Sequence, residues 1–308
     1  MTDPNAPALD PMSPRWSGAP MAGAGASPSL TGRIGSGLRQ LARNRMALIG
    51  LIVLLIAILA AIAAPLIAPY DPKKIAVIDA LQGPTRSHVM GTDNLGRDLF
   101  SRVLYGIRMS VLVAAVSIAV AGIIGITLGL LAGFYGKRVD EVIMRAMDIL
   151  YAFPDLLLAL ALVATFGTGL PSLIVAIAIG RIPGFARITR ASVLSVRENE
   201  YVEAARTIGM GNGRILIRHI LPNGLAPITV MASASLALAI LVEASLSFLG
   251  LGIQPPTPSL GGLLKDALGF METAPWMAIF PGITIALLIF ALNMLGDGLR
   301  DVLDPKLK

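Results

Sequence analysis

Two carboxylates, Asp148 and Asp155, interrupt a stretch of the chain that is otherwise apolar. Ionisable groups inside such stretches are costly, so they are candidates for a transport path or for structural bracing. Seven residues separate them, which would place both on one face of a continuous helix. They could pair with Arg145 or Arg181, or cap a chain break at Pro154. Their position therefore predicts either a polar path or a brace.

Other chemistry is largely excluded. The chain has no cysteine, which removes disulfides, thiolate catalysis and thiolate metal sites. Its two histidines, His88 and His219, are too far apart in sequence to form a metal cluster by themselves. A phosphate-binding loop would need Gly-Lys followed by Ser or Thr, but Gly136-Lys137 runs into Arg138. We therefore expect no catalytic residue, no metal site and no cofactor in this chain.

The composition indicates that lipid surrounds much of the chain. Of its 308 residues, 55% are hydrophobic and 14% are charged, whereas soluble domains carry about 25% charged residues. The net charge of +6 comes from basic residues that fall between apolar runs, which favours membrane orientation over nucleic-acid binding. Residues 1–32, rich in Pro, Ala, Gly and Ser, predict a disordered tail. We expect no signal peptide here, because the cluster of basic residues begins only at Arg33 rather than at the start of this stretch.

Six apolar runs approach the roughly 20 residues that a helix needs to cross the membrane. The third is less regular because it holds charges and Pro154. The fourth is the least secure, since it is short and contains Arg181 and Pro183. We predict an all-α polytopic membrane protein of about six transmembrane helices, at 46–68, 110–134, 142–166, 173–188, 225–249 and 277–295.

The positions of Lys and Arg predict the orientation. Four arginines at positions 33–45 precede the first span, so we expect a cytoplasmic amino terminus. Alternation then places Lys137, the connection 187–219 and the carboxyl-terminal tail inside. The connection 69–108 is expected outside despite its basic residues, because long loops translocate with less regard for charge. Within it, leucine and valine spacing over 95–107 predicts a short amphipathic helix along the outer membrane surface.

The largest predicted cytoplasmic connection contains EYVEAARTIGMGNGRILIRHILP, residues 200–222. The pattern predicts a helix at 201–208, a glycine-rich break, a second helix at 215–221, and entry to the next span at Pro222. Three interpretations are open: a solvated linker, a helix on the membrane surface, and a docking element for a cytoplasmic motor. In the first helix Val202 shares one face with Ala205, which leaves the opposite face for water or a partner.

This stretch resembles the EAA loop of importer-type ABC transporter permeases. In that family the loop is the coupling helix, which sits in a cleft of the ATP-hydrolysing subunit. The resemblance therefore favours the docking element. It implies that the residues that couple this chain to an ATPase are Glu203, Ala204, Ala205, Gly209, Leu221 and Pro222.

Other segments narrow the resemblance to dipeptide and oligopeptide permeases. HVMGTDNLGRDLFSRVLYGIRMSVL (88–112) and EASLSFLGLGIQPPTPSLGGLL (243–264) are similar to two hallmark segments of that group. LARNRMALIGL and GDGLRDVLDPK look like its C-type subunit, and Leu260 departs from it where an aromatic residue is common. The likeness covers nearly everything after about Gly32. Glu243, near the outer end of the fifth span, is expected to meet the substrate's amino terminus or to brace the adjacent loop.

The resemblance implies a type I ABC importer permease fold in a bacterial inner or plasma membrane, with both termini cytoplasmic. It also implies a second homologous permease subunit, two ATP-binding subunits or domains that hold ATP and magnesium, and an extracytoplasmic peptide-binding protein. The expected segments are the tail 1–32, a lead-in and first helix 33–68, an extracytoplasmic loop 69–109, a core permease domain 110–300 and a cytoplasmic tail 301–308.

Three other functions remain open. A stand-alone secondary transporter or channel would explain six spans and carboxylates within them, but not the size of the insert. An ABC importer of a non-peptide solute, such as a nickel chelate, or of glutathione would share every segment quoted above. A stand-alone transporter would purify without an ATPase, whereas an ABC importer would copurify with one. A membrane enzyme is the weakest alternative, because the chain lacks an evident nucleophile and base.

Overall fold

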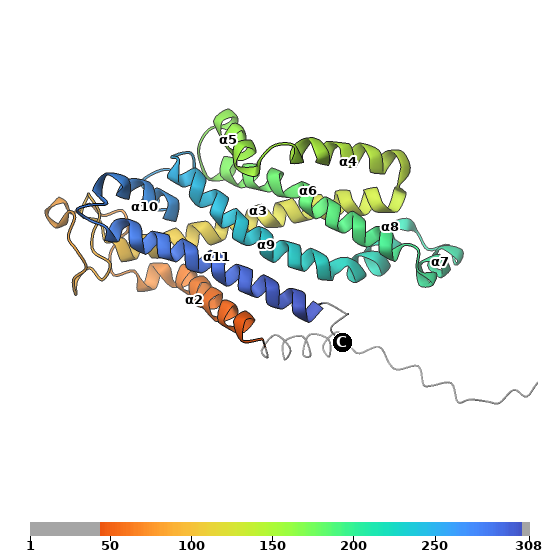
Figure 1. Cartoon of the computed structure of the whole chain (residues 1–308), viewed down its shortest axis with the longest axis horizontal. Helices are drawn as coiled ribbons and strands as arrows, with labels where there is room; N and C mark the ends of the chain where they lie inside the picture. Colours follow the sequence, from red (N-terminus) through yellow and green to blue (C-terminus); the bar gives the residue numbers. More distant parts are fainter. Residues whose placement is uncertain (1–43, 304–308) are drawn as a thin grey trace, which may run out of the picture.

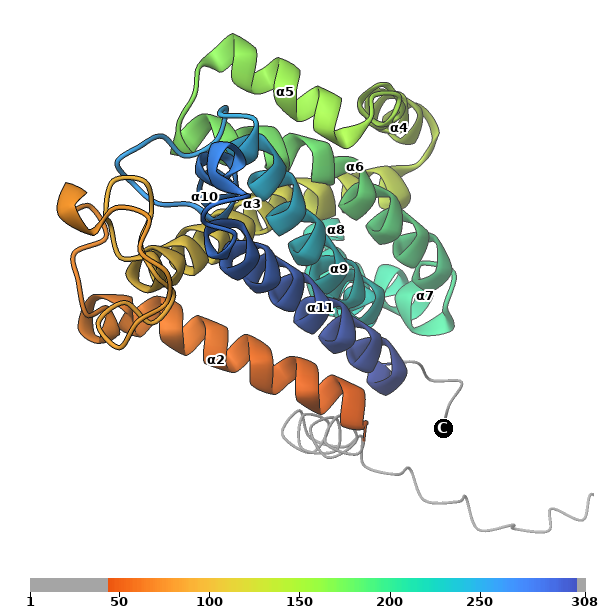
Figure 2. The same cartoon turned by 60° about the vertical axis from the view of Figure 1, so that its left-hand side comes forward.

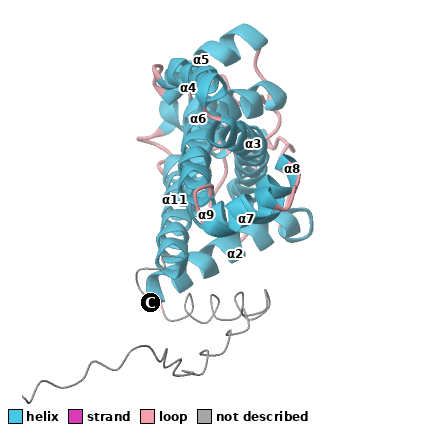
Figure 3. Cartoon of the chain, turned by 90° about the vertical axis from the view of Figure 1, so that its right-hand side faces the viewer, coloured by secondary structure: helices cyan, strands magenta, loops and turns pink. Residues whose placement is uncertain are grey.

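The computed structural model describes residues 44–303, and the tail predicted at 1–32 lies outside them. The described part is almost entirely helical, and its only strand-like pairing is a bridge between Thr92 and Asp98 (Figure 3). Three short elements are η1 (Val77–Asp79), η3 (Leu268–Phe270) and the π-helical η2 (Leu216–Ile220). The α-helices are α2 (Arg45–Ile67), α3 (Leu99–Tyr135), α4 (Lys137–Tyr151), α5 (Asp155–Phe166), α6 (Leu170–Val196), α7 (Glu200–Thr207), α8 (Asn212–Ile215), α9 (Leu221–Phe248), α10 (Leu260–Ala267) and α11 (Trp276–Leu303).

The long helices form one bundle. α3, α6, α9 and α11 pack side by side, α2 packs against α11 and α3, and α4–α5 cover α6 on the opposite flank (Figures 1 and 2). α7 and α8 lie at one end of the bundle, and α10 with the loop before α3 lies at the other (Figure 1). The side chain of Asn44, which caps α2, donates to Asp301 of α11 at 3.0 Å. The start of α2 and the end of α11 therefore meet, at the end that carries α7.

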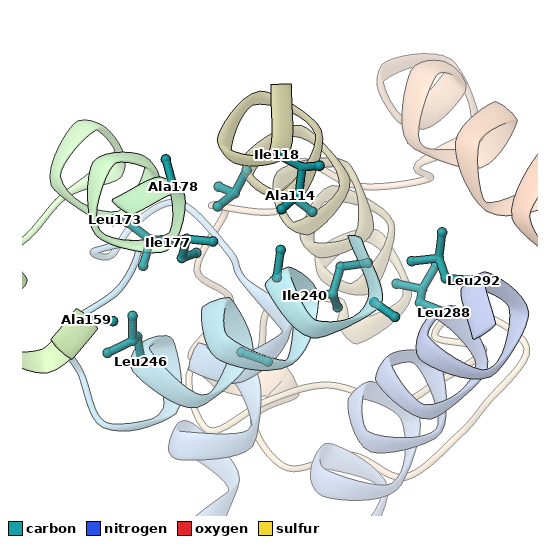
Figure 4. Packing of buried hydrophobic residues seen from close by; sticks show 14 of the residues in the cluster. Ala114, Ile118, Ala159, Leu173, Ile177, Ala178, Ile240, Leu246, Leu288 and Leu292 are labelled. Carbon is teal, nitrogen blue, oxygen red and sulfur yellow. The ribbon is translucent and has the colours of Figure 1, made fainter. Parts of the chain in front are cut away.

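Small residues set the closest helix contacts. A Cβ on Gly125 of α3 would lie 2.6 Å from the Cβ of Phe185, and one on Gly129 would lie 2.4 Å from the backbone oxygen of Ala186. Only glycine lets α3 and α6 approach this closely, as is common between helices in membranes. Figure 4 shows the apolar core between α3, α5, α6, α9 and α11, where Ile118, Ile177 and Ile240, with Leu246 and Leu288, are buried.

The prediction for α3 was wrong at its start. The helix begins at Leu99 rather than at 110 and continues without a break to Tyr135, so no separate amphipathic helix lies along the membrane surface. Asp98 caps it by accepting from the backbone N–H and the hydroxyl of Ser101, at 2.8 and 2.7 Å. Val103 and Ile107, expected on a surface helix, are buried in the bundle.

The third and fourth predicted spans also differ from expectation. The chain bends by 89° between α4 and α5, so residues 142–166 form a broken pair rather than a straight span. α6, which was predicted to be the least secure, is 27 residues long and runs straight through Pro183. Neighbouring helices tolerate proline in such segments by satisfying the freed backbone groups. Five described helices are long and apolar enough to cross a membrane, or six if the bent pair counts as one.

Candidate coupling surface and polar clusters

A glycine turn ends α7. Gly209 has φ of +77°, in the left-handed region that side chains disfavour, and its N–H donates to the carbonyl of Arg206 at 2.9 Å. The N–H of Met210 donates to the carbonyl of Ala205 at 3.1 Å. Gly211 and Gly213 do not have a positive φ. Gly209 is therefore the glycine that the turn itself requires.

α7 is anchored to the bundle by a small apolar core of its own. Val202 is fully buried and Ala205 is 5% exposed, as their shared face predicted. Val202 and Ala205 pack in one cluster with Val193 of α6 and Leu130 of α3. Arg197, which ends α6, donates to the carbonyl of Gly133 of α3 at 2.9 Å. These contacts fix α7 to both α3 and α6. The buried members of this core are Val193, Val196, Val202, Ala205, Ile215, Leu216 and Ile220.

The opposite face of α7 is open. Glu203 and Ala204 are exposed, and Ile208 beside them is 77% exposed. Arg206 is also exposed, but its guanidinium lies 5.2 Å from the centre of the Phe134 ring, which holds it against α3. Ile217, in η2, is 68% exposed but lies beside Leu130 and Leu131 of α3 rather than on α7. The surface of α7 thus combines a free carboxylate, a small residue and an apolar side chain that have no cover within the described chain.

The structure assigns different positions to the six residues expected from the resemblance. Glu203, Ala204, Gly209 and Pro222 are at the surface, Leu221 is half-buried, and Ala205 faces the small core. The second helix expected at 215–221 does not end at Pro222. Residues Asn212–Phe248 form one 37-residue helix that passes through the π segment into α9. The segment that follows the glycine turn is therefore the first part of a bundle helix.

Asp148 and Asp155 lie on different helices because of the bend, so they do not share a helical face. Asp155 accepts from Nη2 of Arg181 at 2.6 Å, which is one of the pairings expected from the sequence. Asp148 accepts from Nη2 of Arg187 at 2.5 Å, whereas Arg145 pairs with Glu141. In addition, Asp140 of α4 accepts two hydrogen bonds from Arg190 of α6. Three ion pairs thus join α4–α5 to α6.

Glu243 is completely buried between α9 and α3. It accepts from the hydroxyl of Ser110 at 2.6 Å and from that of Ser247 at 2.9 Å. The Ser247 hydroxyl in turn accepts from the N–H of Ile253, in the loop before α10, at 3.4 Å. These bonds support the bracing interpretation of Glu243. Its side chain has no exposed surface in the described structure.

A buried ionic cluster holds the loop before α3. Asp93 accepts from Nε of Arg97 at 2.6 Å and from Nη1 of Arg102, and both guanidiniums approach Asp266 of α10 within 4 Å. Asp98 also lies 2.9 Å from Nδ1 of His88. The cluster neutralises Arg97 and Arg102, two of the basic residues that disagreed with the expected external position of the connection 69–108. Sequence reasoning missed it, although the four-residue spacing of Asp93 and Arg97 was a signal.

Two family models match the chain. Residues 125–308 match the binding-protein-dependent transport system inner membrane component, and residues 34–84 match the N-terminal transmembrane domain of oligopeptide transport permease C. The solved structure of the inward-facing MetNI methionine ABC transporter has a similar fold, with a TM-score of 0.55 at 18% identity, over 66% of this chain and 97% of that chain. It confirms the predicted type I importer permease fold.

Curated relatives are similar over most of their length. The dipeptide transport system permease protein DppC of Alkalihalophilus pseudofirmus is 48% identical over 88% of this chain and 89% of that protein. The glutathione transport system permease protein GsiD of Pectobacterium atrosepticum is 46% identical over 88% and 90%, respectively. The di/tripeptide transport system permease protein DppC of Pseudomonas aeruginosa is 46% identical over 88% and 91%.

Proposed function

This chain belongs to the family of binding-protein-dependent transport inner membrane components, as a permease subunit of an ABC importer, and we propose that its cargo is a dipeptide or short oligopeptide. The names of two relatives support this cargo, because they describe transport of dipeptides and of di- and tripeptides, whereas the name of the third describes the alternative, glutathione. Members of this family work in membranes, with ATPase and substrate-binding partners. ATP hydrolysis is the task of the ATPase and not of the permease.

The coupling role of α7 is the second part of the proposal. One observation carries it: α7 is fixed to α3 and α6 by its buried face, while Glu203, Ala204 and Ile208 remain exposed at one end of the bundle. A rigid element with an open carboxylate and apolar side chains suits docking into a cleft of another protein. We propose that α7 docks on an ATP-binding subunit at the cytoplasmic side of the membrane. Both chain ends are expected on the same side.

The remaining partners are proposed from the family to which the chain belongs. A second homologous permease subunit would complete the pathway, and two ATP-binding subunits or domains would hold ATP and magnesium. An extracytoplasmic peptide-binding protein would deliver cargo to the opposite end of the bundle, where α10 lies beside the loop fixed by Asp93. Asp148 and Asp155 belong to the path or to its bracing. No cofactor is assigned to this chain itself.

The coupling role is tested by Glu203→Ala in the assembled importer in proteoliposomes. Because this carboxylate is exposed and fixes nothing within the described chain, membrane insertion and assembly should be unchanged. ATP-driven dipeptide uptake should fall at least tenfold, which corresponds to about 1.4 kcal/mol of lost coupling. Glu200→Ala, which removes a neighbouring exposed carboxylate of the same helix, is the matched control. Full uptake by the Glu203→Ala importer would remove this residue from the docking role.

A second measurement tests the class. The purified chain, free of ATPase subunits, should bind no nucleotide and accumulate no peptide. Uphill uptake by the chain alone would instead identify a stand-alone transporter.

A further inference from the structure

Two ion pairs at the bend between α4 and α5 are open to their surroundings. Asp148 is 63% exposed at its side chain and its partner Arg187 is 48% exposed. Asp155 is 43% exposed, and its partner Arg181 is 11% exposed. In the described chain each carboxylate uses one oxygen for its arginine, while Oδ2 of Asp148 and Oδ1 of Asp155 receive no hydrogen bond. Both pairs therefore keep binding capacity.

Both pairs lie part-way along α6, one of the helices long and apolar enough to cross a membrane. At 1.5 Å per residue, Arg181 is about 16 Å along α6 from Leu170, and Arg187 is about 9 Å further. α6 has 27 residues, so the two arginines fall in its middle and towards its far third. Half-exposed charges in such a helix are costly against acyl chains and usually face a bundle interior or a water-filled cavity. The two ion pairs therefore require water or a polar partner, although Ile149, Phe153 and Leu157 in the same bent segment are exposed apolar side chains.

The bend also supplies an aromatic side chain. The guanidinium of Arg187 lies 4.4 Å from the centre of the Tyr151 ring, which keeps the arginine over the last turn of α4. Ala152 follows directly and is exposed. Two carboxylates, two guanidiniums and one ring, contributed by three helices, thus lie along about 9 Å of α6 on either side of the bend.

We propose that Asp148, Asp155, Arg181 and Arg187, with the ring of Tyr151, form a binding site for a zwitterionic solute that crosses the membrane. The ammonium group of the solute would bind the free carboxylate oxygens, and its carboxylate would bind guanidinium N–H groups. A zwitterion brings both charges at once, so the site stays balanced when it is loaded. The site rests on the proposed peptide cargo, because peptides with free ends carry both groups.

The experiment uses the absence of cysteine from the native chain. Ala152→Cys introduces one thiol beside the site, and Ile56→Cys introduces one on α2, at a position that is 61% exposed on an apolar face. Both variants are assembled with their partner subunits in proteoliposomes and treated with a hydrophilic maleimide. We expect the thiol at 152 to react at least tenfold faster than the thiol at 56. Millimolar alanyl-alanine should slow it at least threefold, whereas N-acetyl-alanyl-alanine amide should not.

Arg181→Gln, added to the Ala152→Cys variant, should abolish the protection by alanyl-alanine while the thiol still reacts. Slow labelling at 152, protection that is absent, or equal protection by the capped peptide would each overturn the site. Dipeptide uptake is measured on the same proteoliposomes. If peptide is taken up but does not protect the thiol, only the proposed binding site is wrong. If no peptide is taken up at all, the proposed peptide cargo is wrong as well.

Discussion

At the scale of single residues, Gly209 shows how one backbone conformation shapes a surface. A Cβ at this position would meet no atom within 4 Å, so the requirement for glycine comes from its φ of +77° alone. Gly213 is equally open, but its φ is not positive. Comparing Gly209 with Gly213 therefore isolates the effect of backbone conformation, because a Cβ would be crowded at neither position.

We expect Gly209→Ala to cost about 1–2 kcal/mol, because a residue with a Cβ is strained in the left-handed region. That cost should lower the melting midpoint of the purified importer by a few degrees and reduce coupled uptake as α7 loses its fixed end. Gly213→Ala is the matched control and should change neither. If both substitutions had equal effects, the conformation of Gly209 would not be what the turn requires.

Residue types alone predicted only part of the polar chemistry. Arg181 was a foreseeable partner of Asp155, because few charges are available inside apolar runs. The pairing of Asp148 with Arg187 was not, because it depends on the 89° bend that carries α4 back along α6. The coupling residues were predicted from the resemblance of residues 200–222 to the EAA loop. The composition of the chain contained no signal for them. Their roles remain a prediction.

At the scale of elements, the cluster around Asp93 fixes the start of α3 and the preceding loop to α10. Arg97 and Arg102 have side chains only 9% and 5% exposed, and each pairs with Asp93. We expect Asp93→Ala to destabilise the protein by about 3–5 kcal/mol, since it leaves buried guanidiniums without their main partner. Faster proteolysis of the loop and a lower melting midpoint would show this.

Asp71→Ala is the control for that experiment. Asp71 is an exposed carboxylate of the same loop and accepts from the N–H of Lys73 at 2.9 Å. Its removal should leave the loop resistant to protease. A loop that stays equally resistant after Asp93→Ala would show that apolar contacts hold it instead.

Elements were predictable where hydropathy alone decides them. The first, second, fifth and sixth spans appear because their apolar runs are long, and they correspond to α2, α3, α9 and α11. The helix predicted over 95–107 was not recognised as the start of the second span, because Asp98 and Arg102 look polar in sequence. Their partners in the fold are His88, Asp93 and Asp266. The angle between α4 and α5 was missed because Pro154 indicates a break without giving its direction.

At the scale of the whole molecule, α7 and η1 lie at opposite ends of the bundle. We expect Glu203→Cys to react with an impermeant maleimide only from the cytoplasmic side, and Val77→Cys, at a position 70% exposed, only from outside. Intact and opened cells separate the two cases, since the native chain has no thiol. Labelling of both thiols from one side would contradict the proposed orientation.

The unbroken run from Asn212 to Phe248 has a mechanical consequence. At 1.5 Å per residue it is a rod about 55 Å long, enough to reach from beyond one leaflet to the far surface of the other. A helix that tilts as one body about its midpoint moves its two ends in opposite directions. A push of a few ångströms near Gly213 would then shift the neighbourhood of Phe248 the other way, so that one mouth narrows as the other widens.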